Sequence, residues 1–349
     1  MNSFLRSNDK LKNLPYESAW TSPANIAFIK YWGKKSFQIP ANPSLSMTLK
    51  ECVTKTVTTF TPASDLTVTL KLNGALNQKF SEKINDFLRH LQSDLPWLSS
   101  LSIEVNTLNS FPHGAGIASS ASGLSAFALT LTDYIYFLDK DFDKADFFKI
   151  ASYLSRLASG SACRSVYGGF SSWGKHQAAD SSDLFATPIK IHDDLMNLQD
   201  TILVINSSEK DVSSRQGHSF MAKHPFAEAR FSQARDNFSR CLSALESGDF
   251  DVVGAILELE ALTLHAMMQT SSRPYFLIKP NTLKAIEAIW AFRRETQIPL
   301  YFTLDAGPNL HLIYTDLYFN KIKTFISHEL EPLCEKIIYD QVGQGPQPC

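Results

Sequence analysis

Residues 110–122 read Ser-Phe-Pro-His-Gly-Ala-Gly-Ile-Ala-Ser-Ser-Ala-Ser. They follow an alternating apolar and polar run at 102–107, which predicts a half-buried strand, and they precede a helical apolar face at 124–135. The glycines take backbone conformations that other residues resist, and the small side chains let a ligand approach the chain. Because the first amides and the positive end of a helix attract anions, this stretch predicts a phosphate-binding turn.

The serine hydroxyls of this turn are candidate ligands. Ser119, Ser120 and Ser122 can offer oxygens to a phosphate or to a metal ion. The stretch differs from the P-loop pattern G-x-x-x-x-G-K-[ST], since no lysine follows the glycines. A tight turn whose small residues only allow close packing is the alternative, and the residue types alone leave both interpretations open.

The sequence on either side predicts an α+β protein of two fused lobes. Residues 1–22 are polar and are expected to form an irregular arm, and Asn281 is expected to cap a helix. Strands are expected at residues 53–60, 66–72, 201–206, 300–304 and 310–315. Helices are expected at residues 81–91, 142–158, 227–247, 250–270 and 281–296.

Composition is that of an ordinary globular protein of 349 residues, with 44% hydrophobic and 19% charged residues. A formal net charge of -2 gives no general attraction to nucleic acid or to anionic membranes. The five cysteines show no C-x-x-C spacing, and the histidines show no H-x-x-x-H spacing, so neither a disulfide framework nor a protein-bound zinc is expected. The N-terminal MNSFLRSNDK has no apolar signal-peptide region, and no apolar run approaches 18 residues. We therefore expect a soluble cytoplasmic protein.

Four further segments carry candidate chemistry. Residues 25–34 (NIAFIKYWGK) place two lysines beside two aromatic residues, which indicates either an anion pocket or the edge of a strand. Residues 159–164 (SGSACR) end in Arg164, which can bind a carboxylate or phosphate through two parallel hydrogen bonds or can lie solvated on a surface turn. Cys163 is interpreted as a packed thiol, because no base stands beside it in the sequence.

The remaining two segments are loops after predicted strands. Residues 304–309 (LDAGPN) place Asp305 in a turn, where it is either a turn former or a rigidly held catalytic carboxylate. Residues 209–215 (EKDVSSR) form either a phosphate-binding loop or a solvated connection. Each segment alone leaves the choice open.

Together these segments resemble the diphosphomevalonate decarboxylases, a family of the GHMP kinase superfamily. The matching stretches are 24–34, 111–122, 159–170, 211–217 and 301–309, which come in the family's order and span most of the chain. NIAFIKYWGK, SGSACRS and DAGPN are specific, whereas sugar and mevalonate kinases share the serine-rich turn more widely.

The resemblance implies a GHMP kinase fold with a ribosomal-S5-like N-terminal lobe at 1–195 and a ferredoxin-like C-terminal lobe at 196–349. It implies ATP and Mg²⁺, and the mevalonate pathway of isoprenoid biosynthesis. The implied reaction phosphorylates the tertiary 3-hydroxyl of 5-diphosphomevalonate and then loses that phosphate with CO₂ to give isopentenyl diphosphate. A cytoplasmic homodimer that binds neither nucleic acid nor membrane is expected.

By resemblance, Asp305 is the catalytic acid, Lys30 lies near the reacting hydroxyl, and Arg164 holds the substrate carboxylate. Ser119 and Ser120 are the expected metal ligands. The other expected substrate-binding residues are Tyr31, Trp32, Gly33, Lys34, Lys83, Ser159, Gly160, Ser161, Ala162, Cys163, Ser214 and Arg215. The nucleotide is expected at Pro112, Gly114, Gly116, Ala118, Ser119, Ser120 and Ser122.

Two residues depart from the family pattern: His113 stands where Thr is commoner, and His218 stands where many relatives have Met. Either could alter phosphate contacts or nucleotide preference. Three alternatives remain: a decarboxylase of 5-phosphomevalonate, a mevalonate-type kinase, and a catalytically silent binding protein of the same fold. Asp305 together with Arg164 favours decarboxylation over a kinase, and Lys30 with these two argues against a silent protein.

Overall fold

Two β-sheets organise the chain in the computed structural model, which describes residues 13–111, 119–141, 143–208 and 212–349. Within this described part, the larger sheet has eight strands and the smaller has four. The larger sheet contains β1 (Tyr16–Ile29), β4 (Ser44–Pro62), β5 (Thr67–Leu72), β6 (Ala75–Leu76), β7 (Leu101–Asn109), β8 (Phe170–Trp173), β9 (Ala186–Ile189) and β14 (Gln347–Pro348). The smaller sheet contains β10 (Gln199–Val204), β11 (Tyr301–Thr303), β12 (Leu310–Tyr314) and β13 (Lys336–Gln341).

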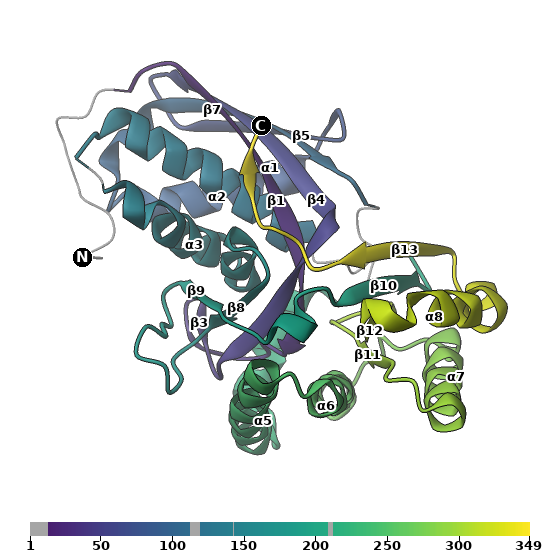
Figure 1. Cartoon of the computed structure of the whole chain (residues 1–349). Coiled ribbons are helices and arrows are strands. Elements are labelled where there is room, and N and C mark those ends of the chain that lie inside the picture. Colours follow the sequence, from purple (N-terminus) through teal and green to yellow (C-terminus); the bar gives the residue numbers. More distant parts are fainter. Residues whose placement is uncertain (1–12, 112–118, 142, 209–211) are drawn as a thin grey trace.

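The strand order explains how distant segments meet. The larger sheet runs β14-β1-β4-β7-β5-β6, with β8 paired to β4 and β9 paired to β8. The smaller sheet runs β11-β12-β10-β13, and its strands pair antiparallel. A separate hairpin joins β2 (Lys34–Ser36) to β3 (Ile39–Pro40). The end of the chain therefore returns to the first strand, as Figure 1 shows.

Helices cover both sheets. The α-helices are α1 (Gln78–Leu91), α2 (Ser119–Leu138), α3 (Phe147–Ala158), α4 (Ser214–Phe220), α5 (Ala227–Ser247), α6 (Phe250–Gln269), α7 (Pro280–Thr296) and α8 (Phe319–Phe325). Short 3₁₀ helices are η1 (Pro96–Ser100), η2 (Lys144–Asp146), η3 (Gly160–Val166), η4 (Asp193–Leu195), η5 (Met221–Lys223), η6 (Asp316–Tyr318) and η8 (Glu331–Leu333), and η7 (Ile326–Leu330) is a π-helical turn. In the part of the chain that the structure covers, no helix combines the length and apolar character needed to span a membrane.

Helix α2 packs closely on the larger sheet through pairs of small hydroxyl side chains. The Thr54 and Ser122 hydroxyl oxygens lie 2.7 Å apart, and those of Thr58 and Thr130 lie 2.8 Å apart. All four side chains are fully buried, so each hydroxyl needs a partner inside the protein. Small residues along α2 therefore allow the helix to approach β4 and satisfy its polar groups (Figure 1).

The two sheets are joined by backbone hydrogen bonds to a buried carboxylate. Asp340 on β13 accepts hydrogen bonds from the amides of Lys50, Glu51 and Cys52 on β4, at 2.8, 2.9 and 2.8 Å. The Gly343 amide also donates to Thr48 O at 2.8 Å. Because these contacts fix β4 against β13, residues from both sheets can meet at one site.

Most predicted elements are confirmed. Helix α5 begins and ends where expected, and Gly248 follows it in the left-handed conformation at φ +80°. Two predictions were wrong. Residues 16–22 belong to β1, because the polar residues Ser18 and Ser22 on its buried side find partners in Asp133 and Ser125.

The predicted cap of the helix at 281–296 was also wrong. Helix α7 begins at Pro280 with Lys279 at the N-cap position. The Asn281 side chain instead donates to Leu333 O at 3.1 Å, which ties the helix to η8. Proline at the first helical position has no amide to cap, so the helix can begin one residue earlier.

Candidate active site

An ion pair between Lys30 and Asp305 lies where the two sheets meet. Lys30 follows β1, Asp305 follows β11, and the Lys30 Nζ to Asp305 Oδ1 distance is 3.0 Å across 275 positions of sequence. The Lys30 side chain is 2% exposed, whereas that of Asp305 is 30% exposed. The lysine is therefore enclosed, and the carboxylate remains open to a ligand on one side.

The electrostatics of the pair keep Asp305 ionised. Burial by itself raises the pKa of Asp305, but Lys30, His311 and Arg164 outweigh burial and hold the pKa below its ordinary value. Burial lowers the pKa of Lys30, and Asp305 and Glu260 counteract part of that change. A carboxylate that stays ionised can accept a proton or orient a hydroxyl.

Glu260 on α6 holds the backbone of Lys30. Its carboxylate accepts the Lys30 amide at 2.9 Å, together with both terminal nitrogens of Arg230 at 2.9 and 2.5 Å and the Asn237 side chain at 2.8 Å. Glu260 is fully buried, and the Arg230 guanidinium balances its charge while the two amides satisfy its remaining hydrogen bonds. Lys30 is thus held at both its backbone and its side chain.

Arg164 lies on η3, in the interior of the protein. Its Nε donates to Ser46 Oγ at 3.0 Å, and its two terminal nitrogens donate to Ser44 Oγ at 2.5 Å and to Asn25 Oδ1 at 3.4 Å. The side chain is 2% exposed, and no carboxylate in the described part of the chain forms an ion pair with it. The alternative of a solvated arginine on a surface turn is therefore wrong, and the buried cation is suited to an anionic ligand.

Residues 31–33 form the turn between β1 and β2, and this turn lies against η3. A Cβ built on Gly160 would lie 2.9 Å from the Tyr31 hydroxyl and 2.8 Å from the Trp173 ring. The Tyr31 hydroxyl is buried and has no hydrogen-bond partner among the residues that the structure describes. Burial raises the pKa of Tyr31, so the phenol stays protonated and can donate to a ligand.

Two residues of η3 have a packing role in this geometry. The Cys163 thiol is fully buried and donates to Gly160 O at 3.0 Å, and burial raises its pKa to about 12. Ala162 is also fully buried. The side chains of Ala162 and Cys163 therefore support the loop, and the expected substrate contacts of these two residues stay predictions. Ser159 and Ser161 are half-buried and can face a ligand.

The serines at the start of α2 separate into two kinds. Ser119 is half-buried and Ser120 is exposed, so their hydroxyls are accessible where the helix begins. Ser122 is fully buried and bonded to Thr54, and its expected nucleotide contact stays a prediction. Pro112, His113, Gly114, Gly116 and Ala118 lie outside the described residues.

The expected cations are spread over three elements. Lys34 is exposed on β2 and donates to Gln38 Oε1 at 2.7 Å. Lys83 is half-buried on α1, with its ammonium 6.0 Å from the centroid of the Phe80 ring. Ser214 is exposed and Arg215 follows it, in the first turn of α4. Their contacts with a substrate remain predictions.

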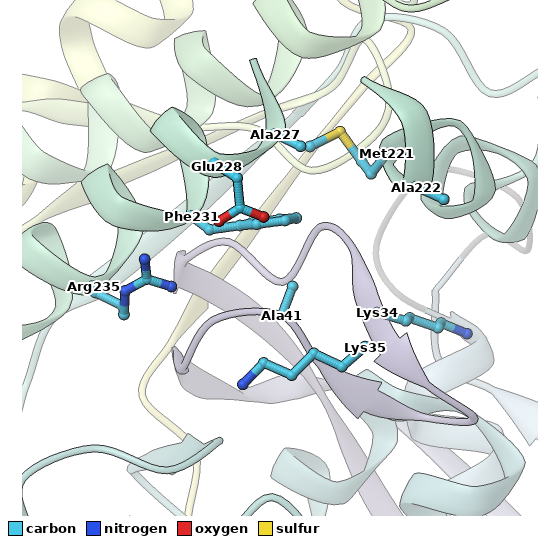
Figure 2. A pocket seen from close by; sticks show the side chains of 9 residues that line it. All are labelled: Lys34, Lys35, Ala41, Met221, Ala222, Ala227, Glu228, Phe231 and Arg235. Atoms are coloured by element: carbon cyan, nitrogen blue, oxygen red, sulfur yellow. The ribbon is translucent and has the colours of Figure 1, made fainter. Parts of the chain in front are cut away.

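A cavity of about 280 Å³ lies beside this site, between β2 and α5 (Figure 2). Figure 2 shows Lys35 and Arg235 on opposite elements of its wall, with Lys34 pointing away from the other side chains. Phe231 lines the cavity and would lie 2.6 Å from a Cβ on Gly33. Lys30, Arg164 and Asp305 do not line it, so we do not assign the reaction to this cavity.

The sequence interpretation missed Glu260, and one signal could have revealed it. On α6, Val253, Ile256, Leu257, Ala261 and Leu264 form the buried face, and Glu260 lies on that same face. A charged residue on an apolar helical stripe needs a buried partner. The residues that bond to Arg164 are two serines and an asparagine. They gave no such signal, because these residue types are common in exposed strands as well as in buried ones.

Asn309 of the DAGPN turn gives a test of how the turn is held. Its Oδ1 accepts the amides of Ile205 at 2.8 Å and Asn206 at 3.0 Å, and it is 5% exposed. We expect Asn309→Ala to lower the free energy of unfolding by about 2–3 kcal/mol, because two enclosed donors lose their acceptor. Urea denaturation measures this loss of stability, and Asn197→Ala at an exposed position is the control. A loss below about 0.5 kcal/mol, the usual size for surface changes, would contradict it.

Known proteins match both halves of the chain. A family profile described as "Diphosphomevalonate decarboxylase-like N-terminal domain" matches residues 22–186, and one described as "Mevalonate 5-diphosphate decarboxylase C-terminal domain" matches residues 201–344. The diphosphomevalonate decarboxylase of Saccharomyces cerevisiae is 30% identical over 329 residues, covering 89% of this chain and 81% of the relative.

Solved structures agree over nearly the whole chain. A complex described as "MDDEF in complex with MVAPP, AMPPCP and Magnesium" is 31% identical with a TM-score of 0.85, covering 96% of this chain and 99% of that chain. The mevalonate diphosphate decarboxylase from Enterococcus faecalis is 29% identical with a TM-score of 0.83 and the same coverage. These matches confirm the predicted α+β fold of the GHMP kinase type. The chain belongs to the diphosphomevalonate decarboxylase family.

Proposed function

We propose that this chain catalyses the ATP-dependent decarboxylation of 5-diphosphomevalonate to isopentenyl diphosphate, with release of ADP, phosphate and CO₂. The observation that carries the proposal is the buried guanidinium of Arg164 beside the Lys30–Asp305 ion pair, with no carboxylate paired to it among the described residues. The family membership supports the same reaction.

Asp305 acts on the hydroxyl that becomes phosphorylated. A tertiary alcohol is a weak nucleophile, so a carboxylate held next to it helps by orienting it or by taking its proton. Asp305 Oδ1 is bound to Lys30, and the side chain remains 30% exposed. Lys30 keeps this carboxylate ionised and in a fixed position, which is what a general base requires.

Arg164 holds the carboxylate that leaves as CO₂. A guanidinium has five N–H donors, and three of those of Arg164 bond to Asn25, Ser44 and Ser46. The two that remain sit on the two terminal nitrogens, which is the arrangement that binds a carboxylate at two points. Fixing the carboxylate in line with the breaking C–C bond makes positioning a large part of catalysis.

The donor set at the start of α2 fits a nucleotide with Mg²⁺. Ser119 and Ser120 are accessible there, and hydroxyl oxygens are suitable partners both for phosphates and for this hard cation. Bound ATP with Mg²⁺ supplies the phosphoryl group that turns the hydroxyl into a leaving group. Ser119 and Ser120 would hold the phosphates and the metal, and the N-terminal end of α2 favours negative charge.

The substrate phosphates are assigned to Lys34, Lys83, Ser214 and Arg215. Three of these residues are cations, and two features of the structure support their assignment. Lys34 adjoins the turn at 31–33, and Arg215 belongs to α4, which packs on the same turn. A diphosphate can engage several cations at once, whereas a monophosphate leaves some of them without an anion. The cytoplasmic homodimer is part of the same proposal and follows from the resemblance.

Diphosphomevalonate should be preferred over 5-phosphomevalonate by at least about tenfold in kcat/KM. Each lost charge-assisted hydrogen bond weakens binding by about 1.5–3 kcal/mol, and 1.4 kcal/mol is tenfold. The measurement compares CO₂ release from both substrates at saturating ATP and Mg²⁺. Arg215→Ala should shrink the preference, and Arg240→Ala on the exposed side of α5 should leave it unchanged. Equal values for the two substrates, or a preference for the monophosphate, would contradict the assignment.

A further inference from the structure

The His218 side chain of helix α4 contacts the turn at 31–33. The Gly33 amide donates to His218 Nδ1 at 3.0 Å, across 185 positions of sequence. The His218 ring also lies between two aromatic rings, with its centroid 4.3 Å from that of Tyr31 and 4.6 Å from that of Trp32. One imidazole therefore touches all three residues of the turn.

The hydrogen bond from Gly33 defines which nitrogen of the His218 ring carries the proton. Nδ1 accepts a hydrogen bond, so it carries no proton, and the proton of the neutral ring is on Nε2. Burial and then the nearby Lys34 ammonium lower the pKa of His218 to about 3. The imidazole is thus a neutral acceptor over the ordinary working range of pH.

The turn has little freedom to adopt another shape. Gly33 has φ +116°, a conformation that side chains disfavour, and a Cβ there would lie 2.6 Å from the Phe231 ring. On the facing helix, a Cβ at Gly217 would lie 2.4 Å from the Trp32 ring. Gly33 therefore lets the turn approach Phe231 of α5, Gly217 lets α4 approach the turn, and His218 satisfies the buried Gly33 amide.

We infer that His218 is a positioning residue for the substrate, which holds the turn at 31–33 in its binding shape by accepting the Gly33 amide. This inference rests on the proposed function, which assigns Tyr31 to the substrate. His218 acts through the turn, because its Nδ1 and its ring face are already occupied by Gly33, Tyr31 and Trp32.

The position of the turn matters because the turn carries the Tyr31 hydroxyl, a candidate donor to the substrate. The Tyr31 hydroxyl is buried and has no partner in the described part of the chain, next to Gly160 of the η3 loop. The same helix that carries His218 begins with Ser214 and Arg215. His218 therefore fixes the position of Tyr31 relative to α4, and the proposed function assigns substrate contacts to both.

Two substitutions distinguish the role of His218 as a hydrogen-bond acceptor from the role of its aromatic ring. His218→Phe keeps an aromatic ring and removes the acceptor, whereas His218→Asn keeps an acceptor at the place of Nδ1 and removes the ring. His218→Leu is a second variant without an acceptor, should the phenylalanine variant fold poorly. Ser219→Ala is the matched control, because the Ser219 hydroxyl is exposed and donates to Gln216 O of its own helix.

We expect His218→Phe and His218→Leu to raise KM for 5-diphosphomevalonate about three- to tenfold, the effect of one neutral hydrogen bond. The kcat and the KM for ATP should stay within about twofold, and His218→Asn should recover most of the KM. Hydrogen exchange of the peptide that covers residues 31–34, measured without any ligand, should become at least about threefold faster in the Phe and Leu variants and not in the Asn variant.

The exchange measurement keeps this inference separate from the proposed function. If the unchanged enzyme releases no CO₂ from diphosphomevalonate, the proposed function fails, and exchange at residues 31–34 alone decides whether His218 holds the turn. The inference is overturned if the Phe and Leu variants leave both KM and exchange unchanged. It is also overturned if the Asn variant is as impaired as they are, or if Ser219→Ala has the same effect.

Discussion

Asp305→Asn should lower kcat by about 10²–10⁴-fold or more, the size of a general acid–base contribution, while ATP and substrate still bind. Asparagine keeps the shape of the side chain but cannot take a proton. In the structure Asp305 is the carboxylate paired with Lys30, and its pKa is held low by Lys30, His311 and Arg164 despite burial. Single-turnover CO₂ release measures the chemical step directly.

The control for this substitution is Asp316→Asn, which changes an exposed acid after β12 in the same part of the chain. We expect it to keep normal turnover. Binding of the substrate to Asp305→Asn, followed by calorimetry, distinguishes lost chemistry from a lost fold. Near-native CO₂ release by Asp305→Asn would remove this residue from the mechanism.

Arg164→Lys should lower kcat/KM by about 100-fold, although it preserves the charge. A lysine ammonium cannot bond to Ser44, Ser46 and Asn25 and also hold a carboxylate at two points. Misplacement of a reacting group by about 1 Å can cost about 10²-fold in rate. Steady-state kinetics on both substrates of the reaction checks this, and the loss should fall on kcat as well as on KM.

Arg240→Lys on the exposed side of α5 provides the matched control, with turnover expected to be unchanged. Thermal unfolding of Arg164→Lys shows whether the enclosed ammonium disturbs the fold. An effect on kcat/KM below about threefold, roughly 0.6 kcal/mol, would count against two-point binding of a carboxylate by Arg164.

The sequence predicted elements whose signal is local. The limits of α5 follow from its apolar periodicity and from Gly248, and the apolar face at 124–135 predicted the helix α2. Residues 16–22 were misassigned because Ser18 and Ser22 look like solvent-facing residues until their buried partners are known. A polar residue inside a strand can be interpreted only when its partner on the covering helix, here α2, is known.

The site itself depends on contacts between distant segments. Lys30 meets Asp305 across 275 positions and Glu260 across 230 positions. Residue types marked Lys30 and Asp305 as candidates, but no periodicity in the sequence shows that they form one ion pair. The position of His218 under the turn at 31–33 was equally beyond sequence reasoning, because a histidine on a short helix has no preferred partner.

The structure also shows that candidate ligand residues of one sequence motif differ in their exposure to solvent. Ser120 and Ser122 stand two positions apart in one serine-rich stretch, yet Ser120 is exposed and Ser122 is bonded to Thr54 in the interior. A helix turns by about 100° per residue, so neighbouring serines of one motif face opposite surroundings. The division of the chain at residue 195 stays a prediction.

The most direct test of the proposed reaction is the ratio of CO₂ to ADP produced from 5-diphosphomevalonate and ATP with Mg²⁺. We expect a one-to-one ratio, with one phosphate released for each CO₂, because Asp305 and Arg164 serve consecutive steps on one bound substrate. Formation of ADP without CO₂ would instead identify a kinase that stops at phosphorylation. Formation of neither product would identify a protein that binds without catalysis. Either of these two results would contradict the proposed reaction.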